Sequence, residues 1–480
     1  MGAVTRFMNQ KARSPGAGVL CACVFVMCAL GYVSRPLHAQ SWQPATQTLG
    51  AEPGEGFALS LSWSAGILER DLWSGVGVEA GYEGDLFAIR VGNPAYIRLY
   101  DIPPRTPRPG GACAWLRCEV LGVGAGTDWT AMSQWVRDLR VGRRDSAFYL
   151  RGGPMRVSLG NGGLIDGYLS SPDPDRRLSA LFVRTLLPAT VRLEAVLGDI
   201  FAPQQLIGMR GAAHPFTWTA DSFWSSPLLQ RIEVAWEMAG DFSAPEQSVQ
   251  KTARRPLLAT QLEMNWPLFE RGGFGQVTPF ASTGAMSGLS ATGDGKSQLG
   301  AGASIGARAE LRFAWLAIRG EGSVGMDSES HRPAIFRSFY ALERQVAWSG
   351  AGAMGAPLVN VAAPGGTNWK ANAEMVFFDA FRFGLRYRTD AAPGSASAEA
   401  FSAFTWGSVR AALSGTRRDA TFSSPWRIQD GQNLWAAEAS WGFFGPFSLY
   451  ARMFRLPRLR AGEVHLWEDA IVGISADLRI

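Results

Sequence analysis

The stretch FRFGLRYR, residues 381–388, alternates apolar side chains with positions that hold arginine or glycine. Because successive side chains of a β-strand point to opposite faces, this alternation predicts a strand with one oily face and one charged face. In a soluble protein the oily face would cover a core. In a membrane barrel it would contact lipid, and the arginines would face the interior. The oily parity holds Phe381, Phe383, Leu385 and Tyr387, and the charged parity holds Arg382, Arg386 and Arg388.

The same alternation recurs along the chain in segments of roughly ten residues, the length of a barrel strand. Many of these segments come in pairs around tight turns of two or three residues, most of which are edged by Phe or Trp. Aromatic residues at strand ends form the girdles of membrane barrels. The pairs are 178–186 with 189–199, 306–313 with 316–324, 370–378 with 381–390, 398–406 with 407–415, and 434–444 with 447–456.

The other connections are longer and polar, such as 170–177, 241–255, 288–297 and 415–432. Short turns at one rim and long loops at the other are the arrangement of outer-membrane barrels. Charged residues make up 18% of the chain, below the ~25% typical of soluble domains. A secreted β-sandwich, propeller or solenoid would also alternate, but no repeat of fixed period favours the last two.

The N-terminus has the pattern of an export signal. Residues 1–13 carry basic residues and no acid, residues 16–33 are apolar, and Ala39 ends a small-residue cleavage site. We therefore expect a signal peptide over 1–39 and a mature chain over 40–480, with an uncleaved anchor as the alternative. Removing the four basic residues of 1–39 from 46 leaves 42 against 41 acidic residues, so the mature chain lacks the basic excess of a nucleic-acid-binding protein.

Two cysteines, Cys113 and Cys118, remain after the signal. An exported protein can hold a disulfide, so this pair could close a small loop, or the two thiols could stay unpaired.

The final stretch, VGISADLRI, alternates up to Ile480 and resembles the C-terminal strand signal of bacterial outer-membrane proteins, although that signal prefers Phe at the end. The segments 149–168 and 206–216 resemble, in style, uncharacterised outer-membrane barrels of spirochaete type. We therefore predict an all-β fold, a transmembrane antiparallel barrel of about 16–18 strands with short periplasmic turns and longer extracellular loops.

Charged side chains on the polar parity must face water, since an arginine facing lipid costs ~2–4 kcal/mol at the bilayer midplane. We expect them to line the lumen, either as selectivity determinants or as ladders of wall ion pairs. The predicted pore-lining set is Arg192, Glu194, Arg308, Glu310, Arg312, Arg319, Glu321, Arg382, Arg386, Arg388, Arg410 and Arg452.

These features predict a porin-like channel for passive diffusion of small hydrophilic solutes, without enzymatic activity, cofactor or metal. Two segments are candidates for a loop that folds into the lumen, 101–119 and 210–229. The expected partners are membrane lipid, small solutes and the barrel-assembly machinery, which would read the C-terminal strand. We expect no nucleic acid, and either a monomer or a homotrimer.

Three alternatives stay open. Asn93-Pro94-Ala95 resembles a motif in the N-terminal hatch of the long-chain fatty acid transporter family, which would imply a gated transporter of hydrophobic ligands with 40–110 as its plug. Otherwise 40–110 would contribute N-terminal strands of the barrel. The barrel could instead be a structural or adhesive protein that presents its loops. A barrel-wall hydrolase would need a base, and the three histidines of the mature chain lie in loop or rim sequence.

Two short motifs have simpler explanations than catalysis. Ser304 lies in GASIG, a G-x-S-x-G match, but an alternating strand of small residues surrounds it, whereas the nucleophile motif needs a strand followed by a helix. Asp327, Glu329 and His331 contain metal-ligand types within one loop sequence, which is weak evidence for a metal site.

Overall fold

The computed structural model describes residues 56–68, 71–100, 135–143, 146–160, 163–170, 179–200, 202–218, 226–245, 254–271, 275–289, 297–337, 340, 344, 348–349, 352–353, 358, 363–389, 396–418, 433–460 and 463–479. The predicted signal peptide, Cys113, Cys118 and the segment 101–119 lie outside these residues.

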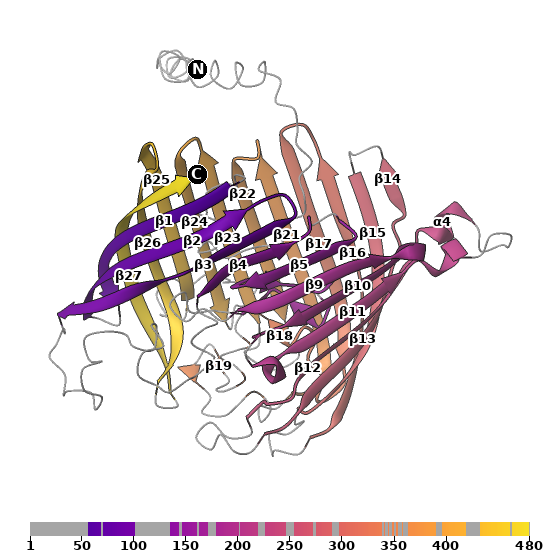
Figure 1. The fold of residues 1–480 in the computed structure, drawn as a ribbon. Coiled ribbons are helices and arrows are strands. Elements are labelled where there is room, and N and C mark those ends of the chain that lie inside the picture. The colour runs from indigo at the N-terminus through magenta and orange to yellow at the C-terminus, as the bar shows by residue number, and fades with distance from the viewer. Residues whose placement is uncertain are drawn as a thin grey trace, which may run out of the picture. The chain divides into compact units, whose positions relative to one another are not determined.

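Most of the strands belong to one large antiparallel sheet (Figure 1). In chain order these strands are β1 (Gly56–Leu68), β2 (Asp71–Glu83), β3 (Phe87–Tyr100), β4 (Val136–Val141), β5 (Phe148–Gly153), β9 (Ala180–Leu187), β10 (Val191–Leu197), β11 (Ile207–Ala213), β12 (Glu233–Asp241), β13 (Leu257–Asn265), β14 (Phe269–Arg271), β15 (Gly275–Ser287), β16 (Leu299–Arg312), β17 (Leu316–Asp327), β21 (Gly366–Phe377), β22 (Phe381–Thr389), β23 (Ser397–Trp406), β24 (Val409–Arg418), β25 (Asn433–Phe444), β26 (Phe447–Arg460) and β27 (Glu463–Arg479).

The remaining elements are short and lie in the connections. They are β6 (Arg156–Val157), β7 (Ile165–Asp166), β8 (Tyr168–Leu169), β18 (Phe336–Arg337), β19 (Trp348–Ser349), β20 (Gly352–Ala353), the 3-10 helices η3 (Pro188–Thr190), η4 (Pro203–Gln205) and η5 (Pro215–Trp218), and the helix α4 (Pro227–Gln230). Among the described residues, no helix is long and apolar enough to cross a membrane.

The sheet closes on itself, because β27 pairs both with β26 and with β1, in the register Ala58↔Arg479 to Ile67↔Ala470. Every sequential neighbour in the wall is antiparallel, and β14 pairs only with β15, beyond the end of β13. The wall is therefore a closed barrel of 20 strands, which confirms the predicted fold class.

The strand number differs from the expected 16–18. The sequence contains roughly twenty candidate segments, and the estimate of 16–18 takes some of them as hairpins within loops, with ~9–11 residues in each spanning strand. In the structure β4 and β5 contain 6 residues each and β10 and β11 contain 7 each, and all four pair on both sides within the wall. Short segments thus take full places in the barrel.

The strand β22 shows how the two faces of the wall divide. Phe383 and Leu385 are 41% and 59% exposed on its outer face, whereas Arg388 is 7% exposed on the inner face. Gly384 lies on that inner face too, where a Cβ would come within 1.9 Å of the Phe401 ring, so the glycine leaves room for Phe401. The outward-facing and inward-facing residues of β22 are therefore those that the alternation in FRFGLRYR predicts.

The two rims of the barrel carry different connections. One rim, called here the turn rim, carries the tight turns 84–86, 188–190, 313–315, 378–380, 407–408 and 445–446, together with the start of β1 and the end of β27. The opposite edge, the loop rim, carries longer connections such as 154–179, 242–256 and 328–365. The predicted separation of short turns from long loops holds for these connections, with two exceptions: the long connection 214–232 joins β11 to β12 at the turn rim, and residues 69–70 join β1 to β2 at the loop rim.

Aromatic side chains collect beside the tight turns. Trp315, Trp406, Trp441 and Phe444 are 49%, 55%, 51% and 74% exposed. Neighbouring rings touch, as in the Phe381–Phe404 pair at 4.7 Å between centroids. Amphipathic rings at this level suit the boundary between lipid headgroups and hydrocarbon, so the turn rim has the aromatic girdle of an outer-membrane barrel.

Candidate functional site

The inner face of the barrel carries the predicted charged residues. Arg192 and Glu194 lie on β10, Arg308, Glu310 and Arg312 on β16, Arg319 and Glu321 on β17, Arg382, Arg386 and Arg388 on β22, Arg410 on β24, and Arg452 on β26. The register places opposite charges side by side on adjacent strands, for example Arg308↔Glu321 and Glu310↔Arg319. The structure thus brings most of these residues into one network instead of leaving them as separate charges.

One group of ion pairs lies on β10 to β12. Arg192 Nη2 is 3.1 Å from Glu233 Oε2, and Arg210 Nη2 is 2.8 Å from the other oxygen of the same carboxylate. Glu194 lies across from Arg210, with 3.9 Å between the nearest charged atoms. The carboxylates and guanidiniums therefore alternate across three strands.

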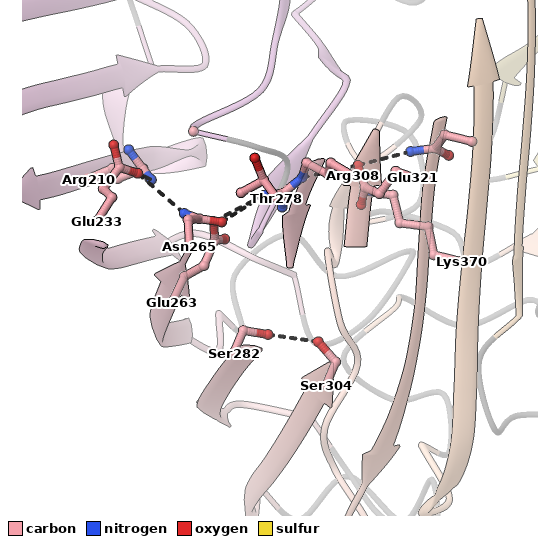
Figure 2. Close-up of polar contacts among 12 residues, drawn as sticks. Arg210, Glu233, Glu263, Asn265, Thr278, Ser282, Ser304, Arg308, Glu321 and Lys370 are labelled. Carbon is pink, nitrogen blue, oxygen red and sulfur yellow. Dashed lines mark hydrogen bonds and ion pairs between the residues drawn. The ribbon is translucent and has the colours of Figure 1, made fainter. Parts of the chain in front are cut away.

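The network continues along the wall through a bridging amide (Figure 2). Asn265 Nδ2 donates to Glu233 at 3.3 Å and to Glu263 at 2.6 Å, while its Oδ1 accepts from Arg308 at 2.7 Å. Arg308 in turn lies 3.6 Å from Glu321. The single uncharged residue, Asn265, uses its donor and acceptor to connect carboxylates on one side with a guanidinium on the other.

A third group lies toward the turn rim. Glu310 Oε1 accepts from Arg312 at 2.6 Å and from Arg319 at 3.1 Å, and Glu374 accepts from Arg382 at 2.6 Å. Further along the wall, between β26 and β25, Arg452 Nε is 2.5 Å from Glu438. Ion pairs thus connect the strands of the inner wall over much of its circumference. Ladders of wall ion pairs are one of the two roles that the sequence allows for these residues.

Two connections from the loop rim contribute the principal buried apolar cluster of the structure. Residues 154–170, the first inserted loop, and the described residues of 328–363, the second inserted loop, pack against inner-face residues of the wall. They are paired in parallel through Phe336↔Ile165 and Arg337↔Asp166. The cluster contains Met155, Val157, Leu159, Leu164, Ile165, Tyr168, Ile335, Phe336, Tyr340, Leu358 and Ala363 from the loops, with Ala180, Val196, Leu206, Ala239, Leu257, Ala259, Met286 and Leu289.

Charged contacts hold the first inserted loop against β21 and β22. Asp166 is 3.1 Å from Lys370 Nζ, 3.2 Å from Arg386 Nη1 and 2.6 Å from Arg388 Nη2. Burial alone would raise the pKa of Asp166, but Arg386, Lys370 and Arg388 together hold that pKa well below its ordinary value. Two arginines of FRFGLRYR, Arg386 and Arg388, therefore bind a carboxylate of the same chain.

A reciprocal contact runs from the same loop to β23. Arg156 Nη2 lies 3.0 Å from Glu399 Oε2, and the Arg156 side chain is 2% exposed. Burial lowers the pKa of Arg156 to about 10, against the opposing effect of Glu399, which still leaves the guanidinium charged at neutral pH. The loop thus forms ion pairs with the wall through both a carboxylate and a guanidinium.

Wall carboxylates also bind the backbone of this loop. Glu237 Oε1 accepts from the N–H groups of Leu164 and Ile165, each at 3.0 Å, and Glu194 Oε2 accepts from the N–H of Gly160 at 3.0 Å. A loop folded into a barrel loses the water that would satisfy its backbone. Glu194 and Glu237 replace part of that water.

The second inserted loop is held at the loop rim by Asp241, which is fully buried at the end of β12. Asp241 accepts from Arg344 at 2.6 and 3.1 Å and from the Tyr340 hydroxyl at 2.8 Å. Burial and the neighbouring Asp241 raise the pKa of Tyr340 well above its ordinary value, so this hydroxyl stays a donor. The bidentate arginine contact is the strong geometry for a carboxylate.

The described residues of 210–229 do not form an inserted loop, contrary to the sequence-based expectation, and 219–225 lie outside the described residues. The first residues of this segment belong to the wall strand β11, and the rest includes η5 and α4 at the turn rim. Trp218 and Leu228 are 55% and 51% exposed there. Two of the aromatic residues that suggested insertion, Phe216 and Trp218, lie instead in η5 at the rim where the other aromatic residues collect.

The N-terminal plug is also contradicted where the structure describes it. Residues 56–68, 71–83 and 87–100 form β1, β2 and β3 in the wall, so this part of 40–110 is no plug. The motif Asn93-Pro94-Ala95 lies within β3, with Pro94 opposite Gly77. This motif therefore lies in a wall strand and not in an N-terminal hatch, where the fatty acid transporter family has it.

Several of the candidate catalytic and metal residues make hydrogen bonds with neighbouring side chains. Ser304 lies in the middle of β16, and its hydroxyl is 2.8 Å from that of Ser282 on the next strand. His331 Nδ1 is 2.7 Å from Asp327 Oδ1, and Asn368 Nδ2 donates to the same carboxylate at 2.5 Å. In the part of the chain that the structure describes, no three His, Cys, Asp or Glu side chains are grouped so as to hold a metal.

Sequence reasoning missed several members of the network. Glu233, Glu237 and Asp241 share one parity of β12 in EVAWEMAGD, so alternation could have found them. Asp166 and Arg156 lie in an irregular loop, where no periodicity indicates their direction. Their role depends on which wall strands lie opposite.

The chain combines a closed antiparallel wall, an apolar outer face, an aromatic rim and a charged interior, which are the features of a membrane-spanning barrel. This chain is an outer-membrane β-barrel. No protein-family model matches the sequence, and no curated protein matches it.

Solved structures with a similar arrangement include OccAB4 of Acinetobacter baumannii, at 9% identity over 89% of this chain and 99% of that chain, with a TM-score of 0.34. Two from Pseudomonas aeruginosa are the outer membrane protein OpdK, at 9% identity over 88% and 97% with a TM-score of 0.31, and OccK5, at 7% over 88% and 97% with a TM-score of 0.33. The similarity to these solved structures is too low to support the assignment, which depends on the strand register of this chain.

Proposed function

We propose that this barrel is a porin-like channel through which small hydrophilic solutes diffuse. The observation that carries the proposal is the band of ionised side chains on the inner face, which continues from β10 across β12, β13, β16 and β17 to β22. A lumen without solvent would make such a band costly, because ion pairs rarely repay the loss of their hydration. A water-filled path is the environment in which the network is stable.

The inserted loops support a narrowed channel. They cover the inner face of one part of the wall, and the apolar cluster includes residues of β9 to β15. Interior-facing side chains alone would leave a wide lumen in a barrel of this strand number. Two loops packed into it reduce the cross-section available to a solute, so we expect passage of small solutes only.

The outer face contacts lipid in this proposal, and the C-terminal strand β27 is the segment that the assembly machinery would recognise. We retain the monomer and the homotrimer as the candidate assemblies. The second candidate function is that of a structural protein whose barrel presents its loops at the surface. The observation that favours it is the pair of inserted loops, because they occupy part of the lumen.

Purified protein in planar bilayers tests the proposal. We expect discrete conductance steps, and in liposomes we expect swelling rates that fall steeply as the size of the sugar increases. Folded protein, identified by circular dichroism and heat-modifiable mobility, that gave no conductance would contradict the channel and favour the structural barrel.

Adjacent cysteine variants on β16 test the placement of the lumen. Ser304→Cys changes a residue on the inner face, and Ile305→Cys changes its neighbour, which is 64% exposed on the outer face. In membranes, a small charged thiol reagent should label the first variant and not the second. Labelling at 305 alone would reverse the assignment of the two faces.

A further inference from the structure

Asp166 lies among more positive than negative charge on the inner wall. Lys370, Arg386 and Arg388 are within 3.2 Å of its oxygens, and its side chain is 3% exposed. The neighbouring charges are Glu321, at 3.0 Å from Lys370, and the pair Arg156–Glu399 at 3.0 Å. The group therefore has four cations and three carboxylates, one of which is supplied by the loop.

The four cations differ in what would remain without Asp166. Lys370 would keep Glu321 and Arg156 would keep Glu399, whereas the ion pair of Arg388 in this group is the one to Asp166. Replacing Asp166 by a neutral residue would change the local balance from one excess positive charge to two. Arg388 lies on the wall strand β22 and Asp166 lies in the first inserted loop, so a loop residue supplies the counter-charge of this wall cation.

Other contacts position this loop independently of Asp166. Glu237 holds the backbone of Leu164 and Ile165 on one side of the residue, and Ile165 packs in the apolar cluster at 0% exposure. Phe336 of the second inserted loop pairs with Ile165 from the other side. The charge of Asp166 can therefore change while the path of the loop is retained.

We propose that Asp166 determines the charge selectivity of the channel, by masking the cation cluster of Lys370, Arg386 and Arg388 with a carboxylate supplied by the inserted loop. The inference rests on the proposed channel function. It goes further by assigning the selectivity to one loop residue instead of to the arginines of the wall. The mechanism is electrostatic, because fixed charge along a confined path concentrates ions of the opposite sign.

The test uses two variants that break the same ion pair from opposite sides. Asp166→Asn removes negative charge, and Lys370→Gln removes positive charge, while both lose the 3.1 Å contact between the two side chains. Reversal potentials in planar bilayers under a KCl gradient measure the chloride-to-potassium permeability ratio of the full-length protein. Heat-modifiable mobility shows that each variant forms the barrel.

We expect Asp166→Asn to raise the chloride-to-potassium ratio, on the order of tenfold at low salt, and Lys370→Gln to lower it. Both shifts should shrink in about 1 M salt, where the Debye length is ~3 Å. Shifts of the same sign in the two variants would show that lost docking and not lost charge is responsible, which would overturn the inference. An unchanged ratio in Asp166→Asn would overturn it too.

The native protein separates this inference from the proposed function. Native conductance with an unchanged Asp166→Asn ratio rejects the role of Asp166 and keeps the channel. A native barrel without conductance rejects both.

Discussion

Two long connections of the barrel lead to opposite outcomes. The described residues of the first inserted loop, 154–160 and 163–170, fold into the lumen, whereas those of 214–232, namely 214–218 and 226–232, lie at the turn rim. Both contain proline and aromatic residues, so their sequences look alike. The difference lies in where the ionisable groups stand: Arg156 and Asp166 lie in the short strands β6 and β7 of the inserted loop, whereas His214, Asp221 and Arg231 of the other connection lie outside η5 and α4.

The charges of the first inserted loop match those on the part of the wall that it covers. Asp166 finds three cations on β21 and β22, and Arg156 finds Glu399 on β23. A loop without Arg156 and Asp166 would cover these wall groups without replacing their water, which costs free energy. In the other connection, the described aromatic residues Phe216 and Trp218 lie in η5 at the turn rim.

The largest expected effect comes from removing the two connections in turn. Replacing residues 156–168 by a short Gly-Ser linker should increase single-channel conductance severalfold, because the loop fills part of the lumen. Replacing 216–229 in the same way should leave the conductance within about twofold. Planar bilayer recordings compare the two, and equal increases would contradict the assignment of the narrowing to the inserted loop.

Next in size is the loss of an anchor on the wall. Asp241→Asn removes the charge that faces Arg344 and leaves a buried guanidinium uncompensated, which typically costs about 3–5 kcal/mol. Urea unfolding of the detergent-solubilised barrel measures the change. Asp379→Asn, in an exposed turn at the turn rim, is the matched control and should fall within about 0.5 kcal/mol. Similar losses in both would show that the anchor is weak.

A smaller effect is expected from pH. The pKa of Asp166 is lower in the folded protein than its ordinary 3.8, so its ionised form contributes stability that is complete above that ordinary value. The contribution is lost as the pH falls through the folded-state pKa. The difference in reversal potential between the native protein and Asp166→Asn should therefore stay constant from about pH 8 to pH 5. A difference that vanished by about pH 6 would show that the cations do not hold the carboxylate.

The smallest effect is predicted at the rim. Trp218 is 55% exposed, so Trp218→Ala should leave the conductance unchanged and alter stability by no more than about 0.5 kcal/mol. Phe336→Ala, which truncates an aromatic residue at 0% exposure between the inserted loops, should cost about 3–5 kcal/mol. Equal losses in urea unfolding would remove the distinction between the two regions.

Alternation along each strand was sufficient to predict the class of fold and the direction of the charged residues. A period of two is a local property, since neighbouring side chains of a strand must point to opposite faces. It placed Arg308 and Glu321 on the inner face and Phe383 and Leu385 on the outer face, and the tight turns with their aromatics indicated one rim. The signal peptide over 1–39 remains a prediction from the sequence.

What only the tertiary structure decided is which residues meet across the barrel. The wall closes with 20 strands because short segments such as β4 and β5 pair on both sides, and pairing is not a local property. Asp166 binds Arg388 across 222 positions of sequence, and no periodicity joins an irregular loop to a distant strand. Sequence alone showed that the arginines of FRFGLRYR face inward, and the fold showed that a carboxylate of the same chain meets them there.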